Sequence, residues 1–296
     1  MRQCSSCGAV IDAPANEVAT ACAYCASHLV DATRGDAVID RVAPFRVPKT
    51  AALDRLRQHL ATRFWAPNAL RRLAARGAVQ AQLQGVLVPY YAYTAECRST
   101  YSARVGVHWY RTEKVKDKDG KTRDKRIQET EWFPLRGSAV GQLRNHLECG
   151  SQGLTPYEAT ALRGFDFGRA VRFDPHLLAG WRAELPSRVR ATVDREAVEH
   201  IRELEARRIR REVLPGDTQR RVTIDGTVTV QGVELVLLPV WITTYTHAGA
   251  VYRLLVHGQT GRCVGKAPVS RVKVGLAALA VAVLGVTILY LSGVLR

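Results

Sequence analysis

The stretch that dominates the chain's architecture reads VGLAALAVAVLGVTILYLSGVL and runs from Val274 to Leu295. It holds no charged residue, and as a helix it is long enough to cross a hydrocarbon core of about 30 Å. A buried core helix is the alternative, but such helices are usually shorter and keep a polar stripe. The pattern therefore predicts a transmembrane anchor over residues 273–296.

The charges around this stretch indicate an orientation. Four basic residues precede it (Arg262, Lys266, Arg271 and Lys273), and only Arg296 follows it. An excess of Lys and Arg marks the cytoplasmic side of a span. No apolar run at the N-terminus could serve as a signal peptide. We therefore expect a tail-anchored, single-pass protein of the inner (cytoplasmic) membrane, with the bulk of the chain in the cytoplasm.

The four N-terminal cysteines predict a metal site. Cys4, Cys7, Cys22 and Cys25 form two CxxC pairs, one residue short of the usual spacing for four-cysteine zinc. Disulfides are the alternative, and a reducing cytoplasm disfavours them. Four protein ligands close the tetrahedron, so we expect one structural Zn²⁺ and no open position for catalysis.

The net charge of +16 is unevenly spread. Residues 1–36 carry a net charge of −2, whereas residues 37–112 carry +9. A basic surface attracts anionic lipid head groups and nucleic acid alike. The candidate contact residues are Arg55, Arg57, Arg63, Arg71, Arg72, Arg76, Lys114, Lys116, Lys118 and Lys121. A solvated helix face and a solvated hairpin tip are the simpler interpretation of these charges.

Sequence patterns predict four helices between the ribbon and the apolar stretch, one of them a short helix that Asn68 caps and that ends at Gly77. Thr50 caps a helix that places Leu53, Leu56, Leu60 and Phe64 on one face. Thr155 and Glu158 have the spacing of a capping box. Asp194 opens a long charged helix that ends before Pro215-Gly216.

Alternating and β-rich segments predict antiparallel strands. They follow Gln84 and cover residues 99–111, 123–133, 221–230, 234–246, 250–256 and 262–264, with a hairpin turn at Asp119-Gly120. Val86–Thr94 and Val236–Thr244 align over nine positions, which indicates an internal duplication.

Motifs of catalysis are missing. The run from Gly261 to Lys266 has too few residues between its glycines for a phosphate-binding loop, and no Ser or Thr follows Lys266. No metalloprotease or nucleophile-elbow motif occurs. His146, Cys149 and His176 show no metal-ligand spacing, and we interpret Cys97, Cys149 and Cys263 as buried thiols. The sequence thus favours a protein that is not an enzyme.

The ribbon, Gln84-GVLVPYY, the charged hairpin, Leu237-LPVWITTY and Tyr252-RLLVHGQTG together resemble a family of bacterial membrane proteins. Its members are labelled transcription factor IIB-type zinc-ribbon proteins, or relatives of the primosomal helicase PriA. The chain lacks the ATP-binding loop of a helicase, so that activity is not carried over. The resemblance implies a ribbon, an α+β body and a C-terminal span, with the four cysteines as metal ligands.

These observations predict an α+β fold with an N-terminal zinc ribbon (1–36), an antiparallel-sheet body with packed helices (37–272) and a transmembrane anchor (273–296). The body would hold two related halves, 45–135 and 188–266. The leading functional hypothesis is a non-enzymatic, membrane-anchored protein-interaction or scaffolding module. The alternative is a membrane-tethered nucleic-acid-binding protein that uses the basic body surface.

Overall fold

The computed structural model describes residues 2–3, 10–11, 17–21, 28–30, 38–62, 83–116, 122–247, 250–265 and 271–291. The chain forms two compact units. Unit 1 comprises Met1–Tyr90, Cys149–Ser187 and Leu235–Arg296, and unit 2 comprises Tyr91–Glu148 and Arg188–Glu234. The units interleave along the chain because three long strands each contribute to both. The domain ranges expected from the sequence stay predictions.

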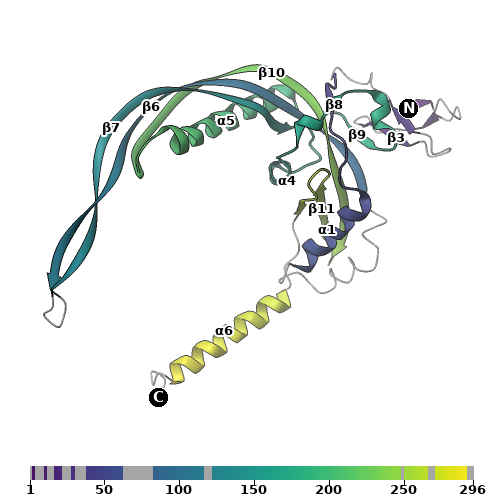
Figure 1. Cartoon of the computed structure of the whole chain (residues 1–296). Coiled ribbons are helices and arrows are strands. Elements are labelled where there is room, and N and C mark those ends of the chain that lie inside the picture. The colour runs from purple at the N-terminus through teal and green to yellow at the C-terminus, as the bar shows by residue number, and fades with distance from the viewer. Residues whose placement is uncertain are drawn as a thin grey trace. The chain divides into compact units, whose positions relative to one another are not determined.

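The described helices and strands appear in Figure 1. The strands are β1 (Arg2–Gln3), β2 (Val10–Ile11), β3 (Glu17–Ala21), β4 (His28–Val30), β5 (Arg41–Val42), β6 (Gln84–Lys116), β7 (Thr122–Cys149), β8 (Val171–Arg172), β9 (Arg182–Glu184), β10 (Thr218–His247), β11 (Ala250–His257) and β12 (Cys263–Gly265). The α-helices are α1 (Lys49–Ala61), α4 (Pro156–Ala161), α5 (Arg190–Arg208) and α6 (Arg271–Leu291), with short 3₁₀ turns at Phe167–Arg169 and Pro175–Leu178.

The main sheet is mixed, so the expected antiparallel body is wrong. Its strand order is β12-β11-β10-β6-β9-β3-β4, with β5 beside β10, β8 beside β5 and β7 beside β6. The pairs β6–β9 and β10–β5 are parallel, whereas β10–β11 and β11–β12 are antiparallel. Each parallel pair involves only two residues of the short strand, β5 or β9. A strand segment of two residues is too short to show a periodic pattern in the sequence, so the parallel pairs were not predicted.

The core of unit 1 contains one face of α1. Leu53, Leu56 and Leu60 are buried against side chains of β10 and β11, which include Trp241 and Leu254. The face predicted from the spacing of these leucines is confirmed, while Phe64 lies outside the described residues. The helix begins at Lys49 with Pro48 as its N-cap, two residues before the expected cap Thr50.

The capping box predicted at α4 is confirmed. The Glu158 amide donates to Thr155 Oγ1 (3.3 Å), and the Thr155 amide donates to Glu158 Oε2 (2.9 Å). Two otherwise unpaired amides at the helix start thereby gain acceptors. Glu158 is buried, and its carboxylate also accepts hydrogen bonds from Arg253.

In unit 2, α5 packs beside the curved strands β7, β6 and β10 (Figure 1). It begins at Arg190, four residues before the predicted start, and buries Val193, Ala197 and Ile201. A π-helical turn at Ile209–Val213 continues it, and Ile209 packs with Ala103, Val105 and Leu214.

The predicted membrane anchor is wrong. Among the described residues, no helix is long and apolar enough to cross a membrane. The helix that the structure describes here, α6, runs from Arg271 to Leu291 and includes the basic residues Arg271 and Lys273 in its first turn. The expectations of an integral, single-pass, tail-anchored inner-membrane protein depend on this span and are corrected with it. Described apolar side chains of α6, such as Leu276 and Leu284, are exposed.

Candidate functional site

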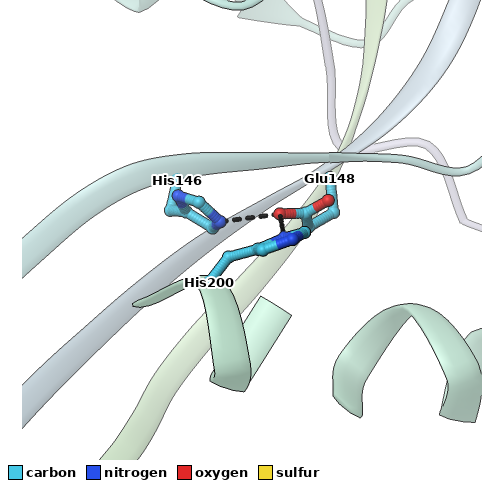
Figure 2. Close-up of side chains that lie close together, drawn as sticks. All are labelled: His146, Glu148 and His200. Atoms are coloured by element: carbon cyan, nitrogen blue, oxygen red, sulfur yellow. Dashed lines mark hydrogen bonds and ion pairs between the residues drawn. The ribbon is translucent and has the colours of Figure 1, made fainter. Parts of the chain in front are cut away.

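Two histidines of unit 2 converge on one carboxylate (Figure 2). His146 and Glu148 stand two residues apart near the end of β7, so a regular strand places both side chains on one face. His200 comes from α5. His146 Nε2 lies 2.8 Å from Glu148 Oε1, and His200 Nδ1 lies 2.7 Å from the same oxygen.

The burial of the three side chains is unequal. The side chains of His146 and Glu148 are each only 5% exposed, whereas that of His200 is 41% exposed. A carboxylate oxygen can accept a hydrogen bond from each ring nitrogen that carries a proton, and Glu148 Oε1 is placed to accept from both histidines. These contacts compensate the cost of burying the charge. Solvent reaches the cluster from the side of His200.

The backbone turns just before the cluster. Asn145 has φ 58°, in the left-handed region, and Asn tolerates this conformation better than most residues. The left-handed residue therefore interrupts the regular strand conformation of β7 directly before His146.

The chemistry of the cluster matches that of a metal centre. Two imidazole nitrogens and one carboxylate oxygen lie within 4.8 Å of one another. Imidazole and carboxylate are ordinary ligands of zinc, iron and manganese. Among the residues that the structure describes, no other set of three potential metal-binding side chains lies as close together.

Unit 1 contains two neighbouring cavities that share Thr244 and Arg253. Their volumes are about 610 and 450 Å³. Arg253 donates to both carboxylate oxygens of Glu158 and to Gly153 O. The guanidinium is thus used to hold Glu158 and the backbone at Gly153 in place.

The sequence-predicted site residues are dispersed. Cys4, Cys7, Cys22 and Cys25 lie outside the described residues, as do Arg63, Arg71, Arg72, Arg76, Lys118 and Lys121. Arg55 and Arg57 are exposed on α1 in unit 1, where Arg57 pairs with Asp54 (3.0 Å). Lys114 and Lys116 are exposed on β6 in unit 2. The described members therefore belong to two different units. The zinc ribbon stays a prediction.

Glu148 and His200 carry no recognisable motif in the sequence, and the spacing around His146 did not predict a metal site. Residues at positions i and i+2 of a strand share a face, so the spacing of His146 and Glu148 could have predicted that their side chains lie together. His200 lies 52 residues from Glu148, and no local pattern joins them. Of the three further cysteines, Cys97 and Cys149 are buried as expected, and Cys263 is half-buried.

No protein-family model, curated protein or solved structure matches the chain. The resemblance to the zinc-ribbon membrane family therefore stays a prediction.

Proposed function

We propose that the chain is a non-enzymatic protein-interaction module, and that the outer part of the β6–β7 hairpin is its contact surface. The observation that carries this proposal is the exposure of large apolar side chains on a two-stranded ribbon. Trp109 and Tyr110 are 45% and 50% exposed, and Val107, Val115 and Phe133 are exposed as well.

The outer part of the β6–β7 hairpin, here called the two-stranded ribbon, begins near Gly106, where the pairing of β6 with β10 stops. Asp217, just before β10, donates its amide to Gly106 O (2.9 Å) and accepts from the His108 amide (2.7 Å). Beyond this point the described partner of β6 is β7 alone, and the two strands project as a ribbon from unit 2 (Figure 1). A projecting two-stranded ribbon buries little of its own apolar surface.

Contacts between the strands stiffen this ribbon. Arg111 Nε donates to Glu129 Oε1 (2.6 Å), and the Arg126 guanidinium lies 4.0 Å from the centre of the Tyr110 ring. His108 Nδ1 lies 2.8 Å from Thr130 Oγ1. A surface held in one shape loses less conformational entropy on binding.

One face of the ribbon is suited to a protein partner. Val107, Trp109 and Val115 stand at alternate positions of β6, so they share a face. Arg111 lies between them on that face, and Trp and Arg are the residues most often responsible for binding energy at protein interfaces. The face therefore combines an apolar anchor with a charged group that confers specificity.

Site-specific photo-crosslinking tests the proposal. A photoreactive residue replaces Trp109 in the full chain, and the matched control replaces Tyr157, an aromatic residue of unit 1 that is 60% exposed. We expect the same protein to crosslink reproducibly from position 109 and not from position 157. Capture of nucleic acid alone from position 109, with binding that weakens steeply with salt, would favour the alternative that Lys114 and Lys116 contact phosphates. An absence of any specific product would remove the support for this surface.

A further inference from the structure

We propose that His146, Glu148 and His200 bind one divalent transition-metal ion. This site is separate from the four-cysteine ribbon and does not depend on the interaction surface proposed above. It belongs to unit 2, where a strand supplies two ligands and a helix supplies the third.

The ligand types select the class of ion. Two neutral imidazole nitrogens and a carboxylate oxygen suit zinc, iron and manganese, whereas magnesium and calcium prefer oxygen ligands alone. The inferred site is therefore specific for transition metals. Three protein ligands also leave at least one coordination position for water or another ligand.

The distances fit an ion after a small adjustment. Ligand atoms at about 2.0–2.2 Å from a tetrahedral zinc ion lie roughly 3.4 Å apart. Each nitrogen already lies within 2.8 Å of Glu148 Oε1, and all three ligand atoms lie within 4.8 Å of one another. The side chain that must move is that of His200, which is half-exposed and therefore less constrained by packing than His146.

Binding must also free the two ring nitrogens of their protons. In a neutral imidazole the proton can move to the other nitrogen, which then needs an acceptor. For His200 water fills that role because the side chain is 41% exposed. Among the described residues, the buried side-chain polar atoms without a partner are Thr243 Oγ1 and His257 Nε2. The second nitrogen of His146 is therefore not stranded in the interior.

The competing explanation is that the three residues form a hydrogen-bonded cluster that merely neutralises a buried charge. Both explanations predict that loss of Glu148 affects the fold. They differ on His200, because an exposed side chain adds little to a structural cluster but is an essential third ligand. His200 is therefore the residue on which the test is built.

The test measures bound Zn²⁺ per full-length chain under reducing conditions. The metal-free wild-type protein is incubated with excess Zn²⁺, free ion is removed, and the bound ion is counted by mass spectrometry. We expect His200→Ala to bind one equivalent of Zn²⁺ fewer than the wild type, whether or not the four N-terminal cysteines also bind Zn²⁺. His176→Ala, which removes an exposed histidine of unit 1, should bind as much as the wild type.

Two further measurements separate loss of a ligand from loss of the fold. Circular dichroism should show that His200→Ala retains the wild-type spectrum. With Co²⁺, the His200→Ala change should remove visible absorption of nitrogen- and oxygen-ligated ion and leave thiolate-to-cobalt bands unchanged. Glu148→Gln, which keeps the shape of the side chain, should weaken binding at this site by at least about 10–100-fold, the cost of losing even an outer-shell partner.

Equal Zn²⁺ content in the wild type and a folded His200→Ala variant would overturn the proposal. So would a Co²⁺ spectrum that His200→Ala leaves unchanged.

Discussion

Pro89 and Pro239 occupy equivalent positions in two copies of one local structure. The amide of Gly150 donates to Pro89 O, and the amide of Gly258 donates to Pro239 O, each over 2.9 Å. Pro89 lies in β6, and Gly150 directly follows the next strand, β7. In the same way, Pro239 lies in β10, and Gly258 directly follows the next strand, β11.

The parallel pairings repeat in the same register. Val86 and Leu87 of β6 lie opposite Arg182 and Ala183, just as Val236 and Leu237 of β10 lie opposite Arg41 and Val42. Moreover, α1 begins seven residues after Val42, and α5 begins seven residues after Ala183. These recurrences support the internal duplication inferred from the aligned sequences.

Substitution of Gly258 by Ala tests the importance of the shared hydrogen bond. A Cβ atom at this position would lie 2.5 Å from Pro239 O, closer than any real contact allows. The strand pair must therefore separate, and we expect Gly258→Ala to lower the free energy of unfolding by about 1–3 kcal/mol. Urea titration of the full chain measures the change. Gly232→Ala is the matched control, because a Cβ there meets no atom within 4 Å, and a cost as large as that at Gly258 would contradict the prediction.

Stability should decrease between pH 6.5 and 4 because of His257. Burial, with a smaller effect of Arg262, lowers the pKa of its imidazole from 6.5 to about 4. In this window the unfolded chain binds a proton that the folded chain excludes, so acidification favours unfolding, in total by about 3 kcal/mol. His257 Nδ1 accepts from the amides of Gln259 (3.1 Å) and Thr260 (3.3 Å), contacts that a protonated ring would lose.

His257→Asn separates this effect from other titrations. The amide oxygen of Asn can accept from the same two backbone amides and does not titrate. The unfolding free energy of this variant, measured by urea titration, should change much less between pH 6.5 and 4. A pH dependence identical to that of the wild type would assign the effect to other groups.

Glu158 affects the free energy of unfolding at a lower pH than His257 does. Burial alone would raise the pKa of its carboxyl, but hydrogen bonds from Arg253 and Thr155 outweigh burial and hold the pKa below 4.5. This stabilisation is fully present above pH 4.5 and is lost as the pH falls through the folded-state pKa. We expect Glu158→Gln to lower the unfolding free energy by about 1–3 kcal/mol at pH 7 and to reduce its fall below pH 4.5.

The control for Glu158 is Thr155→Ala, which removes one side of the capping box but keeps the pair with Arg253. Its expected cost is about 1 kcal/mol, and the acid dependence should largely remain. If Glu158→Gln is no less stable than the wild type at neutral pH, the ion pair does not contribute as inferred.

The features that sequence reasoning recovered are local ones. The capping box lies within four residues, and the face of α1 follows from the spacing of three leucines. The signals of both are complete within one helix, so no knowledge of the fold is needed.

The features that it missed depend on residues far apart in the chain. The parallel partners Val86 and Arg182 are brought together by the topology, as are Glu148 and His200. The membrane anchor is wrong for a different reason. Its prediction rests on the length and the lack of charge of residues 274–295, whereas the helix that the structure describes runs from Arg271 to Leu291 and includes two basic residues.

Three aromatic rings of unit 1 form a cluster beside α1. The Phe45 ring stacks on Trp181 with centroids 4.0 Å apart, and the Trp241 ring lies 4.8 Å from Phe45. Trp241 also donates Nε1–H to Val47 O (2.8 Å) and is buried. Such rings contribute large apolar area, and the indole hydrogen bond satisfies a backbone carbonyl before α1.

Trp241→Phe should therefore cost more than loss of apolar area alone, because it removes the donor to Val47 O. We expect a decrease of about 1–3 kcal/mol in the free energy of unfolding, measured by urea titration with circular dichroism as the signal. Trp109→Phe on the exposed ribbon makes the same chemical change and should cost less than about 0.5 kcal/mol. Equal costs at the two positions would show that the hydrogen bond to Val47 does not stabilise the fold.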